Sequence, residues 1–234
     1  MFYIIALVFG CIWGSFCNVC INRLPKDNNV VIGRSYCPSC KNKISWFDNI
    51  PIFSFLILRG KCRSCKNKIN FQYILVELIA ALSFLIIYYF YGLSFTTLLF
   101  FILNICFIII FFIDLKHYII PNEITYPLMV LGFVKSFYPN LNEKLFPNYI
   151  NSFIGGVLAY SIIWLLIFFY KKLRNKEGMG LGDAKLLSVI GFWFGWIAIP
   201  FVLFFSSLAA LTISLPSLIK KTKNMSTQIP FGPY

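Results

Sequence analysis

Charged side chains are scarce in this sequence. Asp, Glu, Lys and Arg make up 12% of the 234 residues, whereas a soluble globular domain carries about 25%. Hydrophobic residues account for 59% of the chain, aromatic residues for 19%, and the mean hydropathy is +0.77. Such a chain cannot cover a water-facing surface with polar groups. The composition therefore argues against a soluble enzyme and predicts an all-α polytopic membrane protein.

Several sequence signatures are also missing. The chain has a single histidine, His117, so the HExxH motif of zinc proteases, which needs two, is excluded. We interpret His117 as a polar loop residue, with a supporting role beside Asp114 as the alternative. No GxGxxG motif is present, so nothing suggests a Rossmann fold. Residues 1–21 carry no charge and no cleavage site, which favours a retained membrane helix over a signal peptide.

Seven apolar runs predict about seven transmembrane helices. A span takes roughly 20 residues, with a range near 17–25. The run from 124 is short, and the last two runs are divided only by Pro200, so we interpret them as helices folded back on each other. The predicted spans are 1–21, 72–91, 96–113, 124–138, 149–170, 186–199 and 201–219.

The basic residues are distributed unevenly among the loops. Lys and Arg number 21 against 8 Asp and Glu, and 19 of the 21 fall in loops that seven spans place on one side. Only Lys135 and Lys144 lie towards the other side. Positive residues concentrate in cytoplasmic loops. We therefore expect an external N-terminus and cytoplasmic basic loops, and read the charge as topology rather than nucleic-acid binding.

The long polar loop 22–71 contains two CxxC pairs. Cys37 and Cys40 form the first pair, and Cys62 and Cys65 form the second. Two such knuckles are typical of a tetrahedral structural Zn²⁺ site held by four thiolates. Redox dithiols or unpaired cysteines remain the alternative. The four other cysteines lie in apolar runs and are expected to be small core residues; they are Cys11, Cys17, Cys20 and Cys106.

The same loop is basic around its second CxxC pair. We expect this charge to favour anionic lipid headgroups over nucleic acid, because a membrane helix adjoins the loop on both sides. The chain is thus predicted to divide into a first helix, 1–21, a zinc-binding loop domain, 22–71, and a membrane core, 72–234. The basic residues concerned are Arg59, Lys61, Arg63, Lys66 and Lys68.

Two aspartates stand at the ends of predicted spans. Asp114 ends a long apolar run, and Asp183 follows Gly180-Leu181-Gly182, where a helix is expected to begin. An ionisable group at the edge of a span is costly and is a functional candidate. Taken singly, Asp183 could be a helix N-cap, and Asp114 could pair with Lys116 or Lys185.

Taken together, Asp114 and Asp183 predict a more specific chemistry. Both are expected at cytoplasmic ends of spans, one leaving and one entering the membrane. Two carboxyl groups that meet can share a proton, because repulsion and desolvation raise one of the apparent pKa values of the pair. The ionised group then takes a proton from water while the neutral group polarises a peptide carbonyl. The sequence therefore predicts aspartic protease chemistry at a membrane surface.

These residues, with several others in the same order, resemble the type 4 prepilin peptidases, the membrane aspartic proteases of type IV pilus and type II secretion systems. The resemblance covers nearly the whole chain, and the second aspartate segment is similar to the GxGD signature shared with presenilin-like proteases. The segments that carry it are Gly14-Ser15-Phe16-Cys17-Asn18-Val19 with Arg23-Leu24-Pro25, residues 34–40, 46–51 and 60–65, Asp114 with Ile120-Pro121-Asn122, residues 180–186, and Ile229-Pro230-Phe231-Gly232-Pro233-Tyr234.

The resemblance implies a multi-pass enzyme of the bacterial inner membrane. Family enzymes cut the short basic leader of prepilins or pseudopilins after a glycine, on the cytoplasmic side. They then methylate the new N-terminal residue, usually Phe, with S-adenosylmethionine. The resemblance makes Asp114 and Asp183 catalytic, and it implies active-site support from Gly180, Gly182, Lys185, Pro121 and Asn122.

Methyl transfer rests on the resemblance alone. It is associated with the N-terminal cysteine-containing region, and Glu77 could bind a substrate amine or pair with Arg23 or Lys68. Family members usually continue through an eighth helix after the closing motif, so either this chain is shortened or its last helix is dispensable. The residues implied in methylation are Gly14, Ser15, Asn18, Arg23 and Glu77.

Three other functions are compatible with parts of the sequence. One is a leader peptidase without methylation, although relatives of that kind lack the cysteine loop. Another is a proton- or metal-coupled transporter that uses Asp114 and Asp183 as a relay, although its spans would need more polar residues. The third is a zinc-ribbon membrane adaptor, which leaves the paired aspartates unexplained.

Overall fold

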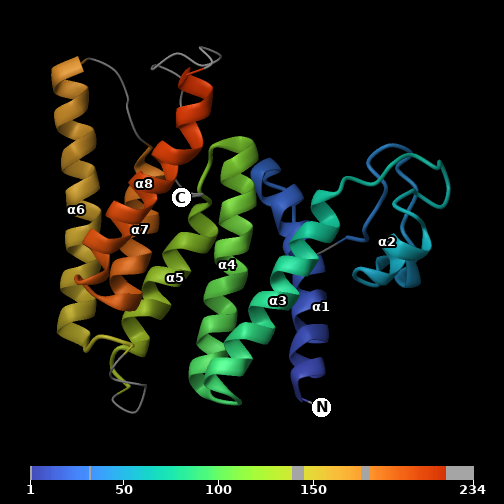
Figure 1. Cartoon of the computed structure of the whole chain (residues 1–234), viewed down its shortest axis with the longest axis horizontal. Helices are drawn as coiled ribbons and strands as arrows, with labels where there is room; N and C mark the ends of the chain where they lie inside the picture. Colours follow the sequence, from blue (N-terminus) through green and yellow to red (C-terminus); the bar gives the residue numbers. More distant parts are fainter. Residues whose placement is uncertain (1, 32, 139–144, 175–179, 220–234) are drawn as a thin grey trace. The chain divides into compact units, whose positions relative to one another are not determined.

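A computed structural model describes residues 2–31, 33–138, 145–174 and 180–219. Over these ranges the chain is helical, and its only β-type pairings are two isolated bridges (Figure 1). It divides into two compact units, 1–112 and 113–234. The helices are α1 (Phe2–Arg23), α2 (Phe53–Ile57), α3 (Gln72–Tyr91), α4 (Phe95–His117), α5 (Asn122–Lys135), α6 (Tyr149–Arg174), α7 (Leu181–Phe194) and α8 (Ala198–Ile219), with 3-10 turns η1 (Leu24–Lys26) and η2 (Trp46–Asn49).

Each predicted span overlaps a helix, although 186–199 crosses the end of α7 and the start of α8, and the all-α membrane fold is confirmed. Among the described residues, four helices are long and apolar enough to cross a bilayer: Phe2–Lys26, Gln72–Tyr91, Phe95–His117 and Tyr149–Leu173. The helices α5 and α7 have 14 residues each, fewer than the roughly 17 that a full span takes. Seven spans, and the three-part domain division, stay predictions. The closing segment Ile229–Tyr234 lies outside the described residues.

The break between the last two helices does not fall at Pro200. The helix α7 ends at Phe194 and α8 begins at Ala198, so the chain turns at residues 195–197. Pro200 lies in the first turn of α8, where its missing amide costs no helical hydrogen bond. Beyond this turn α8 runs back along α7 (Figure 1).

In unit 1, α1 and α3 pack closely, and α4 packs on α3. A Cβ on Gly14 would lie 2.7 Å from the Cα of Glu77, so only glycine allows this approach of α1 to α3. The rings of Phe84 and Phe101 stack with centroids 4.0 Å apart between α3 and α4. The predicted core cysteines of this unit are buried, except for the half-buried Cys106.

The loop between α1 and α3 is organised by side chains at its two ends. Among the described residues of the following segment, the Arg23 guanidinium donates hydrogen bonds to the backbone carbonyls of Asn29, Val30, Gly33 and Arg34. The two cysteine knuckles have the same local pattern, because each is closed by an antiparallel bridge, Tyr36–Lys43 in the first and Lys61–Lys68 in the second. At the far side of the loop, the Ile52 amide donates to Glu77 Oε2 in α3 at 2.8 Å. The loop is therefore attached to both helices that flank it.

In unit 2, α7 packs against α5, α6 and α8. Trp193 of α7 is fully buried, and its Nε1 donates to the Leu128 carbonyl of α5 at 2.9 Å. In the opposite direction, Lys135 of α5, which is 2% exposed, donates a hydrogen bond from Nζ to the Trp193 carbonyl of α7 at 2.8 Å. Its ammonium group lies 3.9 Å from the Phe146 ring centroid, where a cation–π contact is favourable. These contacts fix α5 and α7 in one arrangement.

Candidate active site and metal centre

The first candidate carboxyl group, Asp114, lies in the last turn of α4. Its side chain is buried, with 4% exposed. The helix ends beyond it because Tyr118 takes a left-handed φ of 57° and its amide donates to the Asp114 carbonyl at 3.0 Å. His117, the last residue of α4, is exposed. The chain then passes through Ile120 and Pro121 directly into α5.

The second candidate carboxyl group, Asp183, lies in the first turn of α7 and is half-buried. It precedes the predicted span 186–199. Burial, and then the charge of Asp114, raise the pKa of Asp183 to about 6, against a smaller lowering by the Gly180 amide. The contribution of Asp114 to this shift indicates that the two carboxyl groups are close enough to interact electrostatically. The site can therefore retain a proton at a pH where an isolated aspartate has lost it.

The glycine before Asp183 allows this proximity. A Cβ on Gly182 would lie 3.0 Å from the Cβ of Ile120, closer than the 3.4–4 Å of ordinary contacts. Ile120 belongs to the segment between Asp114 and α5, so the bare Gly182 backbone lets α7 begin against that segment. Gly180 is different, because a Cβ there would lie 3.7 Å from Asp183 Oδ2, an ordinary separation.

The interpretation of Asp183 as the helix N-cap is wrong. The N-cap of α7 is Gly180, not Asp183. Asp183 stands three residues further on, and its carboxylate accepts a hydrogen bond from the Gly180 amide. This is the position from which an acidic side chain reaches back in a capping box. Capping and acid–base chemistry are compatible, since the contact uses only part of the acceptor capacity of a carboxylate.

Lys185 faces the start of α5. Its Nζ donates to Asn122 Oδ1 at 2.6 Å and lies 5.3 Å from the centroid of the Tyr126 ring. The carbonyl of buried Pro121 accepts from the Thr125 amide at 3.2 Å and from the Thr125 hydroxyl at 3.1 Å. The structure thus brings the implied support residues together at the junction of α5 and α7. Sequence reasoning missed Thr125 and Tyr126, although both stand about one helical turn after Asn122 at the start of α5.

The four loop cysteines converge on one point. Their Sγ atoms all lie within 4.8 Å of one another, and Cys37 Sγ is 3.9 Å from Cys65 Sγ. A tetrahedral zinc with Zn–S distances near 2.3 Å separates its sulfurs by about 3.8 Å, so the cluster fits this ion. Amide hydrogen bonds from Cys40 and Ser39, with thiol contacts, lower the pKa of Cys37 to about 6. A thiol that ionises readily is suited to metal binding.

The residues implied in methylation also come together, except for Arg23. Gly14 lies against the backbone of Glu77, and the Ser15 side chain hydrogen-bonds to the Glu77 carboxylate. Asn18 Nδ2 donates to the Tyr73 carbonyl at 3.0 Å, whereas its Oδ1 is buried without a partner among the described residues. Glu77 pairs with the Ile52 amide rather than with Arg23 or Lys68. The unsatisfied Asn18 oxygen could accept from an ammonium or amino group.

Comparisons with known proteins agree with this arrangement. Residues 8–91 match the bacterial peptidase A24 N-terminal domain, and residues 101–215 match the type IV leader peptidase family. The chain is similar to the prepilin leader peptidase/N-methyltransferase of Neisseria gonorrhoeae, at 35% identity over 98% of this chain and 85% of that protein. Proteins with the same name from Aeromonas salmonicida and Pseudomonas aeruginosa are each 32% identical, over 100% of this chain and 87% of each relative. No solved structure matches the chain.

Proposed function

The chain belongs to the type IV leader peptidase family, and from this membership and the site geometry we propose that it is a prepilin leader peptidase and N-methyltransferase of the bacterial inner membrane. The substrate is a prepilin or pseudopilin with a short basic leader, cut after a glycine. The observation that carries the peptidase half is the raised pKa of Asp183 beside the buried Asp114. A shared proton is the chemical requirement of an aspartic protease.

Cleavage then follows from the two carboxyl groups. One of the pair is ionised and removes a proton from a water molecule, whose oxygen attacks the carbonyl carbon of the glycine. The protonated partner donates a hydrogen bond to the carbonyl oxygen and stabilises the negative charge that develops on it. Proton transfer to the amide nitrogen lets the carbon–nitrogen bond break. The products are the leader with a carboxyl terminus and the pilin with a free amine.

Gly182, Lys185 and Asn122 support this reaction without taking part in the bond changes. The contact between Gly182 and Ile120 sets the distance between the start of α7 and the segment after Asp114. The hydrogen bond from Lys185 to Asn122 joins α7 to the first residue of α5. Both contacts favour a preorganised carboxyl pair, which needs little rearrangement when a substrate arrives.

We infer that the reaction takes place at the cytoplasmic surface. The division of 19 basic residues against 2 supports cytoplasmic placement of the loops 22–71, 114–123 and 171–185. A substrate helix inserted in the membrane would then present its leader at the level of both aspartates. Membrane-impermeant labelling of a cysteine introduced at Asn49 should fail in intact cells and succeed after lysis; labelling in intact cells would refute this topology.

The four loop cysteines would hold a structural Zn²⁺. Four thiolates complete a tetrahedral shell and leave no position for a substrate, so the ion would organise the two knuckles and would not act on the peptide bond. Arg63 in the second knuckle forms a bidentate pair with Asp48, at 2.8 and 2.6 Å. This contact joins the second knuckle to η2, so a metal-stabilised knuckle would also hold η2 in place.

The methyl group would come from S-adenosylmethionine, which supplies an electrophilic carbon to the free amine. The residues that fit an amine are Asn18, with its unsatisfied Oδ1, and Glu77, which stands one helical turn after Tyr73, the α3 residue that Asn18 contacts. They would orient the amine, and Glu77 could accept the proton that it loses on methylation. Ser15 donates to Glu77 and would hold that carboxylate in place.

One experiment tests both halves of the proposal. Purified protein is incubated with a peptide that carries a basic leader, a glycine and a hydrophobic helix, with and without S-adenosylmethionine. We expect the leader to be released in both samples, and a mass increase of one methyl group on the pilin product only with the methyl donor. Cleavage without methylation would identify a peptidase alone. Absence of both products would contradict the proposed function.

A further inference from the structure

The loop between α1 and α3 exposes several large apolar side chains on η2 and α2. Trp46 and Ile57 are each 75% exposed, Phe53 is 67% exposed and Leu56 is 61% exposed. Phe53, Leu56 and Ile57 share one face of α2, and η2, which carries Trp46, contacts α2. Exposed apolar side chains grouped in this way mark a contact surface, unlike scattered single ones. We name these four residues the apolar patch. Its composition favours contact with an apolar partner.

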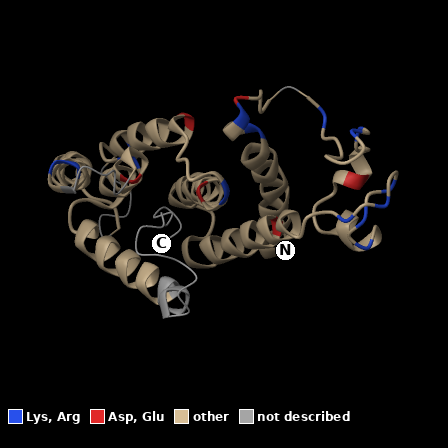
Figure 2. Cartoon of the chain, turned by 90° about the horizontal axis from the view of Figure 1, so that it is seen from above, with Lys and Arg blue, Asp and Glu red and all other residues tan. Residues whose placement is uncertain are grey.

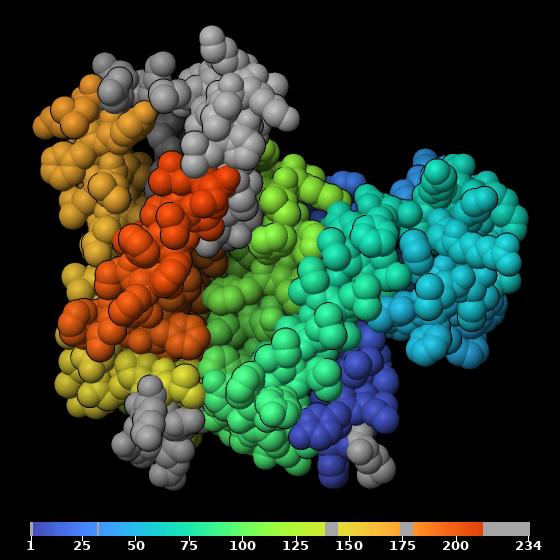
Figure 3. Space-filling view, viewed as in Figure 1, coloured from blue at the N-terminus to red at the C-terminus, as the bar shows by residue number. Residues whose placement is uncertain are grey.

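A hydrogen bond to Glu77 fixes the position of the apolar patch along the axis of α3. The Ile52 amide donates to Glu77 Oε2 at 2.8 Å, and α2 begins at the next residue, Phe53. Glu77 stands five residues after Gln72, the first residue of α3, which is about 7.5 Å along a helix axis. Figure 1 shows α2 at the lower edge of the loop, beside the upper part of α3, and the same edge is a cyan surface in Figure 3. The patch therefore lies level with the end of a candidate membrane span.

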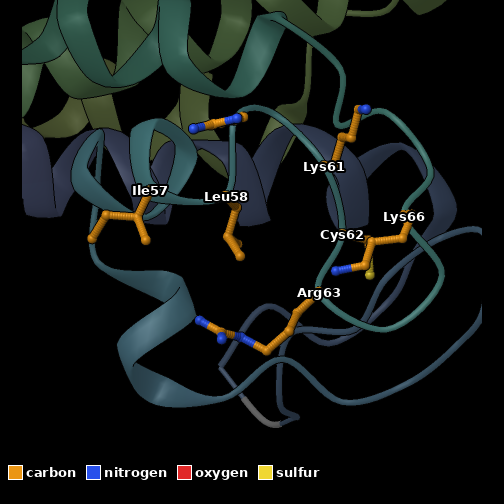
Figure 4. Close-up of a pocket in the computed structure, with 7 residues that line it drawn as sticks. Ile57, Leu58, Lys61, Cys62, Arg63 and Lys66 are labelled. Carbon is orange, nitrogen blue, oxygen red and sulfur yellow. The ribbon is translucent and has the colours of Figure 1, made fainter.

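A basic pocket adjoins the apolar patch. It is a cavity of about 200 Å³ lined by two apolar and four basic side chains and by Cys62, without an acidic residue. Figure 4 draws these side chains around the opening, and Figure 2 shows basic residues gathered on this loop. Ile57 belongs to both the patch and the pocket. The lining residues are Ile57, Leu58, Arg59, Lys61, Cys62, Arg63 and Lys66.

The charge of the basic pocket is only partly compensated. Arg63 is paired with Asp48. Among the residues that the structure describes, Arg59, Lys61 and Lys66 are exposed and have no hydrogen bond or ion pair from their side chains. Three uncompensated cations around one opening attract an anion, and the adjoining apolar side chains favour an anion with an apolar body. A phospholipid has this combination.

We propose that the apolar patch and the basic pocket form an interfacial anchor whose occupant is an anionic phospholipid. The apolar side chains lie among the upper acyl chains, and the pocket binds the lipid phosphate. Trp prefers the headgroup level, and long basic side chains extend their charges towards it. The proposal that lipid binds here depends on the position of α2 beside α3. The assignment of the bound lipid to the cytoplasmic leaflet rests on the topology proposed above.

Anionic lipid is favoured over a nucleic acid by the same geometry. A nucleic acid would neutralise the pocket but leave the four apolar side chains in water. It would also have to approach a surface level with the end of α3, where the bilayer interface lies. A lipid satisfies both parts at once, because its phosphate and acyl chains lie at adjacent depths.

A matched pair of variants tests the phosphate part. Lys66 and Lys41 follow the second and first cysteine knuckles, and both take a φ of 59°. Lys66 lines the pocket and Lys41 does not. The full-length protein in detergent is titrated with phosphatidylglycerol, phosphatidylcholine or inorganic phosphate, and bound lipid is counted by native mass spectrometry.

We expect phosphatidylglycerol to bind more tightly than phosphatidylcholine. A juxtamembrane cation contributes about a fivefold change in affinity, so Lys66→Gln should weaken binding about fivefold and Arg59→Gln with Lys66→Gln about 25-fold. Lys41→Gln should change it less than twofold. Equal losses from Lys66→Gln and Lys41→Gln would overturn the pocket assignment. Equally tight inorganic phosphate would show an anion site that does not require lipid.

The apolar part needs a separate readout. The protein and its Trp46→Phe variant are placed in bilayers of phosphatidylglycerol with or without bromine on the acyl chains, and the difference between their spectra isolates Trp46. We expect bromine to quench this difference signal strongly. An unquenched Trp46 would overturn insertion of the patch. Zinc content and cleavage of the prepilin-like peptide are measured alongside, so failure of the lipid anchor is distinguished from failure of the peptidase proposal.

Discussion

Adding one methyl group at Gly182 should separate the two carboxyl groups. The new Cβ would lie 3.0 Å from the Cβ of Ile120 and 3.3 Å from its Cγ1 and Cδ1. Restoring the 3.4 Å of an ordinary contact requires a shift of about 0.4 Å between α7 and the segment after Asp114. Since a misplacement of about 1 Å can cost ~10²-fold in rate, this shift should lower kcat/KM by roughly 3–10-fold.

The matched control is Gly180→Ala. Its Cβ would meet Asp183 Oδ2 at 3.7 Å, and the φ of −81° is open to alanine. This variant should keep cleavage within about twofold of the wild type. Gly182→Val, with two further carbons directed at Ile120, should lose on the order of 10²-fold or more. Kinetics on one leader peptide measures all three.

Stability gives an independent check on the cause. Alanine favours a helix over glycine by up to about 1 kcal/mol, whereas overpacking costs about 1–3 kcal/mol. The melting temperature of Gly182→Ala should thus change little while its activity falls. Ile120→Ala removes two of the three close contacts and should restore part of the rate in the double variant. Full activity of Gly182→Ala, or greater loss from Gly180→Ala, would refute this reasoning.

Three further predictions concern other parts of the protein. Metal analysis should find about one Zn²⁺ per chain, and Cys62→Ser should release it and reduce methylation more than cleavage, measured on cut and uncut peptides. The raised pKa of Asp183, about 6, implies a shared proton that is present below this pH and lost above it. The rate of cleavage should therefore fall up to tenfold per pH unit above pH ~6. The rate of methylation of a precut peptide should not show this decline. Lys135→Met leaves the buried Trp193 carbonyl unpaired, which costs about 1–3 kcal/mol. It should lower the melting temperature in detergent, whereas the exposed Lys172→Met should not.

The helical fold could be predicted because long apolar runs in the sequence indicate helices that span a membrane. Runs such as 72–91 and 149–170 have no other way to satisfy their backbone in a membrane, and the helices α3 and α6 coincide with them. The position of the turn before α8 could not be predicted in this way. Pro200 is compatible with both a helix start and a helix break, and the choice depends on packing after Phe194.

The candidate site was predictable in its residue types but not in its contacts. A carboxyl group at the end of an apolar run is costly, so Asp114 and Asp183 could be recognised from sequence. The contact of Gly182 with Ile120 could not, because it depends on how two segments 62 positions apart pack. The partner of Glu77 could not be predicted either. Glu77 accepts a hydrogen bond from the backbone amide of Ile52, and the Ile52 side chain gives no sign of this contact.

The most direct test of the carboxyl pair compares Asp114→Asn, Asp183→Asn and the double variant on one leader peptide. Each single substitution should lower cleavage by at least ~10²–10⁴-fold, and the double variant should be little worse, because the pair acts as a unit. Asp27→Asn is the control, since Asp27 is exposed in the loop between α1 and α3. Methylation of a precut peptide should survive in all variants. Near-normal cleavage by either single variant would contradict the shared-proton mechanism and leave that aspartate with a structural role.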